Sequence, residues 1–307
     1  MNLFKIRLPC QSARRVRFLR SAPIIATALA ACVGALIPVR GQTVPRGLAA
    51  YDFGKAPRQN DLGKSLAEIS GLAFGEGGRL FAHHDERALV FELDPATGRI
   101  ARSFHVGRNG LRGDFEGMAI AGTRMFLISS DGALLEFAAG SEGAGVEAVR
   151  IRLATRRVCR EIEGLDFDPS SESLLLACKF TSGRELRDRL VVLRYSLRTK
   201  KLDPAPFLSV PLQGLARFGL KAEFSPSGIA IHPRTGTLFI VAARENLLVE
   251  LDRSGTFLGV IDLRGKVHHQ PEGIAFGSDG ALYIADEGRS GRATLTVYPA
   301  DASRFPR

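Results

Sequence analysis

Acidic side chains recur at fixed distances before glycines, a pattern that could bind a metal ion. Glu116, Glu163 and Glu272 each directly precede a glycine. Carboxylate oxygens from separate segments suit a hard cation, and loose spacing suits calcium better than magnesium. We therefore expect a Ca²⁺ site made by these glutamates and by the acids that lie three residues before a glycine, which are Glu68, Asp114 and Glu161.

A second set of polar residues flanks short apolar runs and could form the rim of a ligand site. Its histidines leave zinc or manganese as a weaker alternative to calcium. Each feature also has an ordinary structural interpretation, since glutamates before glycines can cap turns and paired histidines are common on surfaces. The rim candidates are His83, His84, Asp85, Lys179, Arg244, His268, His269, Asp286 and Glu287.

The elements that would position these side chains are repeats. Five stretches share a glycine followed by alternating apolar residues: EISGLAF (68–74), DFEGMAI (114–120), EIEGLDF (161–167), SPSGIAI (225–231) and QPEGIAF (270–276). Their glycines are spaced by 46, 47, 64 and 45 residues. After each stretch come a turn and further short apolar runs, which predict antiparallel strands. A period of about 45 residues with four strands is typical of a β-propeller blade.

The sequence thus predicts an all-β propeller of five four-stranded blades, with six as the alternative because the third unit is long. The fifth unit ends after three runs, so we expect the segment LAAYDFG (48–54) to supply its fourth strand and close the ring. In a blade, the innermost strand starts on the face to which the second strand returns. The glutamates and the rim candidates should therefore meet around one axial mouth.

The glycine-centred repeats resemble those of a known family. The stretches EIEGLDFDPSSESLLLACK (161–179) and PEGIAFGSDGALYIADEG (271–288) are similar to the SdiA-regulated family of β-propeller proteins, over about residues 60–290. More distantly they resemble gluconolactonase-type and phytase-like propellers. The resemblance implies the fold but no chemistry. Ser70 and Ser227 stand where the other repeats have glutamate, so the predicted ring of acids is incomplete.

The net charge of +10 does not indicate a nucleic-acid-binding surface. Residues 1–41 hold seven basic groups and no acid, so residues 42–307 hold 35 basic and 32 acidic groups. This small excess gives no reason to expect a polyanionic partner. Residues 42–307 are expected to form a single propeller domain and to be monomeric.

Residues 1–41 have the features of an export signal. Basic residues precede an apolar stretch from Ala22 to Val39 and a small residue at Gly41. Lipidation at Cys32, or an uncleaved segment that tethers the protein to the membrane, are alternatives to cleavage. The sequence therefore predicts an exported protein, periplasmic or associated with the cell envelope. Exported proteins meet oxidising conditions, and we expect a disulfide between Cys159 and Cys178.

No catalytic motif stands out. The sequence contains no nucleophile elbow, Walker A loop, C-x-x-C pair, zinc-protease helix motif or dinucleotide fingerprint. The favoured interpretation is a binding or interaction module whose cation-bearing mouth holds a small molecule or a protein. The alternative is a metal-dependent hydrolase of a lactone or phosphoester. The sequence leaves open whether the protein is an enzyme.

Overall fold

The computed structural model describes residues 47–265, 267–288 and 292–305. The chain divides into two units, Met1–Gln42 and Thr43–Arg307, and all described residues belong to the second. The expected export signal at 1–41, with Cys32, lies outside the described residues. Among the residues that are described, no helix has the length and apolar character needed to cross a membrane.

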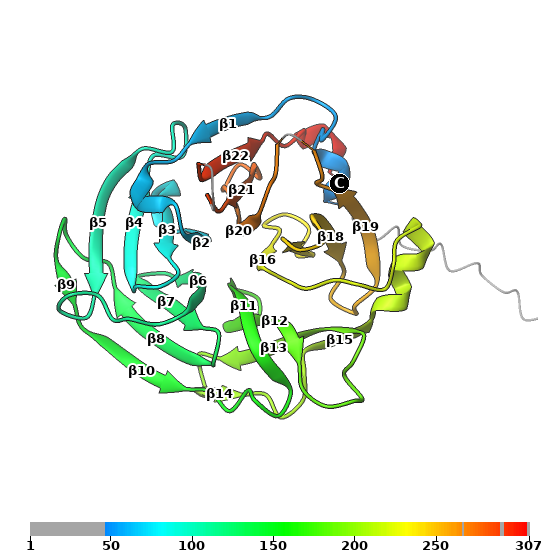
Figure 1. Cartoon of the computed structure of the whole chain (residues 1–307), viewed down its shortest axis with the longest axis horizontal. Coiled ribbons are helices and arrows are strands. Elements are labelled where there is room, and N and C mark those ends of the chain that lie inside the picture. Colours follow the sequence, from blue (N-terminus) through cyan, green and yellow to red (C-terminus); the bar gives the residue numbers. More distant parts are fainter. Residues whose placement is uncertain (1–46, 266, 289–291, 306–307) are drawn as a thin grey trace, which may run out of the picture. The chain divides into compact units, whose positions relative to one another are not determined.

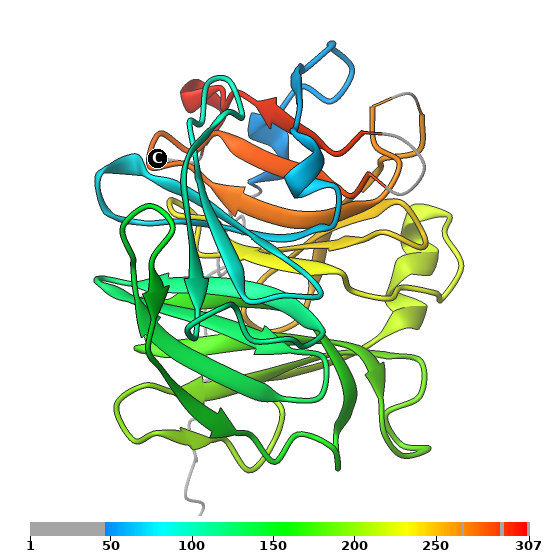
Figure 2. The same ribbon diagram turned by 60° about the vertical axis from the view of Figure 1, so that its left-hand side comes forward.

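Five mainly antiparallel sheets surround a common axis (Figures 1 and 2), which confirms the predicted five-bladed propeller. Blade 1 contains β2 (Ile69–Phe74), β3 (Leu80–His84), β4 (Leu89–Leu93) and β5 (Ile100–Val106), with β9 (Gly145–Val146) parallel to β5. Blade 2 contains β6 (Phe115–Ala121), β7 (Arg124–Ser129), β8 (Ala133–Ala138) and β10 (Ala148–Arg152). Blade 3 contains β11 (Cys159–Asp168), β12 (Ser173–Thr181), β13 (Arg189–Ser196), β14 (Lys201–Leu202) and β15 (Leu208–Pro211). Blade 4 contains β16 (Gly228–Ile231), β17 (Leu238–Ala242), β18 (Leu247–Leu251) and β19 (Phe257–Asp262).

Blade 5 contains β20 (Pro271–Phe276), β21 (Leu282–Asp286), β22 (Thr294–Tyr298) and β1 (Arg58–Asp61). The long third unit forms no sixth blade. Its additional residues supply β14 and β15, which both pair with β13, and the 3₁₀ helix η4 (Leu212–Phe218). The remaining 3₁₀ helices are η1 (Leu48–Ala50), η2 (Lys64–Leu66), η3 (Glu76–Gly78) and η5 (Ala302–Arg304).

The ring is closed by β1, which pairs with β22 from Arg58 opposite Val297 to Asp61 opposite Thr294. The prediction that segment 48–54 forms this strand was wrong. The outermost strand of a blade packs little surface against neighbours, and the sequence of β1, RQND, is polar and largely exposed. It therefore lacked the apolar alternation by which the other strands were recognised.

Segment 48–54 instead packs into the core. It contains η1 and the buried side chain of Tyr51, whose hydroxyl donates a hydrogen bond to the carbonyl oxygen of Gly280 at 2.6 Å. The ring of Tyr51 also packs edge-on against Phe239, with the ring centroids 6.2 Å apart. The apolar residues of this segment thus reflect packing against blades 4 and 5, and not strand pairing.

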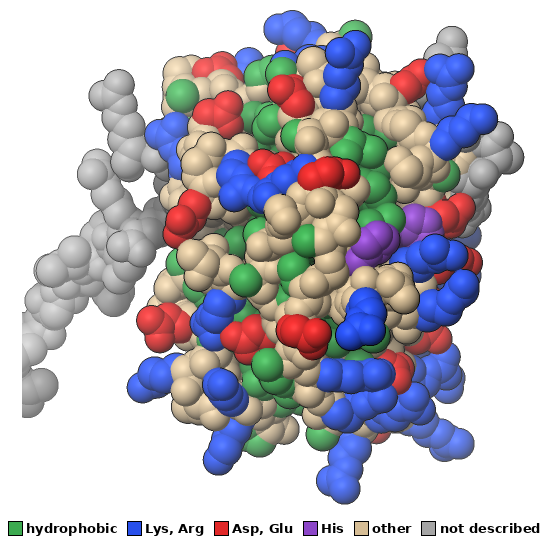
Figure 3. Space-filling view, turned by 90° about the vertical axis from the view of Figure 1, so that its left-hand side faces the viewer, with side chains coloured by type: hydrophobic (Ala, Val, Ile, Leu, Met, Phe, Trp, Pro, Cys, Tyr) green, Lys and Arg blue, Asp and Glu red, His purple; other side chains and the backbone are tan. Residues whose placement is uncertain are grey.

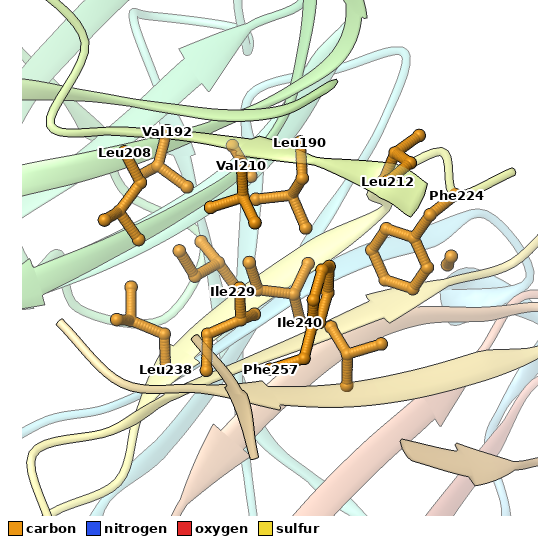
Figure 4. Packing of buried hydrophobic residues seen from close by; sticks show 14 of the residues in the cluster. Leu190, Val192, Leu208, Val210, Leu212, Phe224, Ile229, Leu238, Ile240 and Phe257 are labelled. Carbon is orange, nitrogen blue, oxygen red and sulfur yellow. The ribbon is translucent and has the colours of Figure 1, made fainter. Parts of the chain in front are cut away.

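Hydrophobic clusters fill the spaces between neighbouring blades. Between blades 3 and 4, Leu190 and Val210 pack with Ile229, Ile240 and Phe257 (Figure 4). Four further clusters join the other pairs of blades around the ring. Each fully buried aliphatic or aromatic side chain contributes about 1.5–3 kcal/mol, so these clusters hold the blades against one another.

Glycines allow the inner strands to approach closely at the axis. A Cβ atom on Gly117 of blade 2 would lie 2.7 Å from the backbone nitrogen of Leu165 in blade 3. One on Gly228 of blade 4 would lie 2.4 Å from the carbonyl oxygen of Glu272 in blade 5. Any side chain at these positions would push neighbouring blades apart. The repeated glycine is therefore required by the narrow axis.

Acidic and basic side chains are interspersed over much of the outer face of blades 1 and 2, shown in Figure 3. On blade 1, the carboxylate of Glu92 lies 2.6 Å from Arg79 and 2.5 Å from Arg102. On blade 2, Arg124 lies 3.2 Å from Glu136. Partly exposed ion pairs contribute only about 0–1 kcal/mol each, so they tie adjacent strands together without dominating stability.

Candidate binding site at the axial mouth

The residues that directly precede the repeated glycines gather at one end of the axis. Glu116, Glu272, Ser70 and Ser227 line a central channel together with the glycines. The free volume of this channel is about 10 Å³, which is room for about one water molecule. A larger ligand must therefore sit above these side chains and not inside the channel.

Glu116 lies in β6 with a partly buried side chain. The Ser70 hydroxyl donates a hydrogen bond to Oε2 of Glu116 at 3.1 Å. Burial raises the pKa of Glu116 to about 9, and the negative charges of Glu163 and Asp114 act in the same direction. The Glu116 carboxyl is therefore protonated at neutral pH.

Glu272 occupies the equivalent position in blade 5. Burial raises its pKa to about 8, although a hydrogen bond from the side-chain amide of Gln270 at 2.9 Å opposes this effect. The same amide also donates to Glu287, one of the rim candidates. Two of the three central carboxyls thus keep a proton at pH 7.

Glu163 is the central carboxyl that forms an ion pair with a lysine of the same chain. Its Oε1 atom lies 2.7 Å from Nζ of Lys179, at the end of the neighbouring strand β12. Burial raises the pKa of Glu163 in spite of this ion pair, and Glu161 and Asp114 add to the increase. Burial alone would lower the pKa of Lys179, but the pair with Glu163 outweighs it, so the Lys179 pKa is raised. Lys179 therefore stays charged among the carboxyls.

The acids that lie three residues before a repeated glycine, Glu68, Asp114 and Glu161, divide into two groups. Asp114 acts on Glu116 and Glu163, and Glu161 acts on Glu163, so both belong to the central cluster. Glu68 instead lies near Asp85, whose pKa is raised by burial first and by Glu68 to a smaller extent. Within the described ranges, no three His, Cys, Asp or Glu side chains are arranged to hold a metal ion.

His83 and His84 differ strongly in environment. His83 is fully buried, and its Nε2 atom lies 2.5 Å from where a Cβ of Gly71 would be. Burial lowers the pKa of His83 to about 4, so this ring is neutral and packed beneath the mouth. His84 is partly exposed, with its Nδ1 atom 3.0 Å from the carboxylate of Asp85.

His268 and Asp286 form a buried network inside blade 5. Nδ1 of His268 lies 2.7 Å from Oδ2 of Asp286, and Nε2 lies 2.8 Å from the hydroxyl of Tyr298. The backbone N–H of His269 donates to Asp286 at 2.8 Å, whereas the His269 side chain is exposed. This network fixes the loop that leads into β20 and leaves only His269 facing solvent.

Arg244 and Lys179 line a neighbouring pocket of about 530 Å³ between blades 3 and 4. Both cations lie over the ring of Phe180, with Arg244 Cζ 5.7 Å and Lys179 Nζ 5.9 Å from the ring centroid. Arg160 is placed similarly, at 5.7 Å. The mouth therefore has an acidic centre and, on one side, a basic and aromatic wall.

Asp166 was missed in the sequence analysis. It lies two residues after the glycine of blade 3, where the other blades have Ala73, Ala119, Ala230 and Ala275. This single departure from the repeat, an acid where the other blades have alanine, is the sequence signal that could have identified it. Asp166 lines a pocket at the opposite end of the axis.

The fold and the acidic mouth can be compared with known proteins. Residues 210–304 match the SdiA-regulated family. The match confirms the resemblance that the glycine-centred repeats predicted, and it covers the last two blades. No curated protein sequence matches this chain.

Solved structures support the fold. A glutaminyl cyclase of Myxococcus xanthus is 16% identical, with a TM-score of 0.54, and the match covers 79% of this chain and 95% of that one. A PQQ-bound aldose sugar dehydrogenase from Streptomyces coelicolor is 14% identical, with a TM-score of 0.49, over 79% and 99% of the two chains. At 16% identity, the likeness to the glutaminyl cyclase shows the fold alone.

Proposed function

We propose that this propeller is a binding module whose axial mouth holds a divalent cation. The ligands would be the carboxylates of Glu116, Glu163 and Glu272, with Asp114 and Glu161 close enough to add charge. The observation that supports the proposal is the electrostatic coupling of the three carboxyls: the charges of Glu163 and Glu272 act on Glu116, and burial raises the pKa of Glu116 and Glu272. Because the described side chains are not arranged as a ready ligand set, the proposal requires them to rearrange when the ion binds. The ionised forms of these carboxyls would repel one another, and a cation that replaces the protons would offset that repulsion.

Calcium fits this donor set best. The donors are oxygens from different blades, without the regular octahedral arrangement that magnesium demands. The ion would bind at the mouth above the narrow channel, where it could bridge to a small molecule or a protein. Lys179 competes with it, because its ammonium already neutralises Glu163.

A binding role is favoured over a hydrolase role by the state of the histidines. His83 is packed against Gly71 and His268 is bonded to Asp286 and Tyr298. Both ring nitrogens of His268 are thus occupied, whereas Nε2 of His83 has no hydrogen-bond partner among the described residues but is buried away from solvent. His268 is therefore not available as a general base at the mouth, and His83 is available only to a water that reaches its buried position. A metal-dependent hydrolase of lactones or phosphoesters would have to use a carboxylate or one of the two outer histidines as its base.

We further propose that the protein is exported. The disulfide between Cys159 and Cys178, with Cα atoms 5.5 Å apart, supports this placement because such bonds persist in oxidising compartments. The features of residues 1–41 point the same way. Fractionation of cells that produce the full chain tests the proposal, and recovery of the protein only from the cytoplasm would overturn it.

The calcium site is tested by isothermal titration of Ca²⁺ into chelator-treated protein at pH 8.5. We expect Glu116→Gln, Glu163→Gln and Glu272→Gln each to weaken binding about tenfold or more, the effect of losing about 1.4 kcal/mol. The matched control is Asp252→Asn in the turn between β18 and β19, where Asp252 accepts backbone hydrogen bonds. Absence of binding at millimolar Ca²⁺, or equal binding by all variants, would contradict the proposal.

The same proteins distinguish the hydrolase alternative. Lactones and phosphoesters are offered to the wild type with and without Ca²⁺. Turnover that requires Ca²⁺ and is lost in Glu116→Gln would make the protein an enzyme. Binding of Ca²⁺ without turnover would support the binding module.

A further inference from the structure

A second cavity lies at the other end of the axis, away from the mouth. Its volume is about 430 Å³, which is within the range of small-molecule sites. Each inner strand contributes to it the residue three positions after its glycine. These equivalent residues are Phe74, Ile120, Phe167, Ile231 and Phe276.

Asp166 is the acidic group that stands inside this apolar ring. Its Oδ2 atom accepts the N–H of Ile231 in blade 4 at 2.7 Å, and Oδ1 accepts the N–H of Phe167 at 2.8 Å. The carboxyl is thereby held in one orientation by two strands. Each oxygen retains a further lone pair that can accept another hydrogen bond.

The other charged groups around the cavity are already paired. Asp168 accepts hydrogen bonds from Arg253 at 3.2 Å and from the hydroxyls of Ser170 at 2.7 Å and Ser171 at 2.6 Å. In the described parts of the chain, Asp166 has no basic side chain in contact with it. The cavity therefore carries one uncompensated negative charge when Asp166 is ionised.

His232 also borders the cavity but is committed to other partners. Its Nε2 atom lies 3.0 Å from the hydroxyl of Tyr51, and its Nδ1 atom accepts the N–H of Thr235 at 3.1 Å. Burial lowers its pKa to about 4. His232 is thus neutral and contributes no charge near Asp166 above pH 5.

We propose that this cavity binds a small apolar molecule that carries a protonated amine. The apolar body would lie against the ring of phenylalanine and isoleucine side chains, and the ammonium would bond to Asp166. A cation is stabilised by a carboxylate that is held in one orientation, and aromatic faces add a favourable cation–π contribution. This site is independent of the cation proposed at the mouth.

The ionisation of Asp166 gives the site a distinctive pH dependence. Burial raises its pKa to about 7, with a smaller contribution from the charge of Asp168. The groups that face it, Asp168 paired with Arg253 and the neutral His232, do not change charge between pH 6 and 8. Amine binding should therefore strengthen over this range, while binding of a neutral analogue stays constant.

The test uses three probes of similar size, 2-phenylethylamine, 2-phenylethanol and phenylacetate, titrated into the full chain by calorimetry or ligand-observed NMR. At pH 8 we expect the amine to bind about tenfold more tightly than the alcohol, the gain from one charge-assisted hydrogen bond. Phenylacetate should bind most weakly of the three, because its carboxylate is repelled by Asp166. Asp166→Asn should remove the preference for the amine. Ile120→Phe, which fills the cavity and keeps the carboxyl, should weaken the amine and the alcohol alike.

Glu136→Gln on the outer face of blade 2 is the matched control and should leave all three affinities unchanged. Added Ca²⁺ should not change them either, which separates this proposal from the calcium site. Urea unfolding of Asp166→Asn verifies that the variant is folded. Lack of amine binding at millimolar concentration, or an amine preference that survives in folded Asp166→Asn, would overturn the proposal. Unchanged binding of both the amine and the alcohol to Ile120→Phe would also overturn the proposal.

Discussion

The Nζ atom of Lys179 lies 2.7 Å from Oε1 of Glu163 at the centre of the acidic mouth. The two residues come from adjacent strands of blade 3, and Glu163 is only 5% exposed. The chain thus places its own cation where we propose a metal ion. We therefore expect this pair to affect both the stability of the mouth and the binding of added cations.

Replacement of Lys179 by methionine should lower the free energy of unfolding by about 2 kcal/mol, because it leaves a buried carboxylate without its partner. Urea denaturation at pH 7 measures this effect. The double variant Lys179→Met, Glu163→Gln should recover most of the loss. A double variant as unstable as the single one would show that Lys179 acts by packing and not by charge.

The same single variant should bind Ca²⁺ more tightly than the wild type, because the competing ammonium is gone. This effect is opposite in sign to that of the glutamate variants. Calorimetric titration at pH 8.5 measures it. Weaker binding by Lys179→Met would mean that the lysine supports the site and does not compete with the ion.

Stability should fall as the pH rises from 7 to 9. The pKa values of Glu116 and Glu272 are raised to about 9 and about 8, so the folded protein holds protons that the unfolded chain has already lost. Each such carboxyl lowers the free energy of unfolding by at most about 1.4 kcal/mol per pH unit until its folded pKa is passed. The urea midpoint should change less with pH across this range in Glu116→Gln and Glu272→Gln than in the wild type. A slope identical to that of the wild type would contradict the raised pKa values.

The disulfide should stabilise blade 3. Cys159 and Cys178 are both buried and enclose a short loop, with a sequence separation of 19 residues. Loss of a cross-link of this length costs about 3 kcal/mol in the chain-entropy model. We expect the Cys159→Ala, Cys178→Ala variant to show this loss in denaturant unfolding. Two free thiols in the mass spectrum of the unreduced protein would contradict the bond itself.

Tyr51 should contribute substantially to the stability of the fold, although it lies outside the sheets. Tyr51→Phe removes the hydrogen bond to Gly280 and the contact with His232, and should cost about 1 kcal/mol. Tyr51→Ala also leaves a cavity and should cost about 3–5 kcal/mol, the range for large aromatic truncations. Exposed Asp52→Ala in the same segment is the control. Equal stability of all three variants would show that segment 48–54 does not anchor the ring.

The repeated pattern alone predicted a propeller of five blades, with six left open by the long third unit, and also the closeness of the inner strands and the position of the central glutamates. These properties are local, because strand alternation and a glycine every 45 or so residues depend on near neighbours in the chain. The cysteine pair was predicted for the same reason. Its strands form one hairpin, and irregular pairing between Cys159 and Ile162 brings Cys159 back to Cys178.

Tertiary structure decided which side chains meet across the ring. The polar strand β1 closes blade 5 because an outer strand needs backbone partners and little apolar surface. His83 and His268 were predicted on the rim but are buried, because neighbouring strands cover them. Asp166 reaches the N–H of Ile231, 65 residues further on, only because closure of the ring sets blade 3 beside blade 4. Contacts of this kind depend on the packing of whole sheets, and no periodicity within one segment records them.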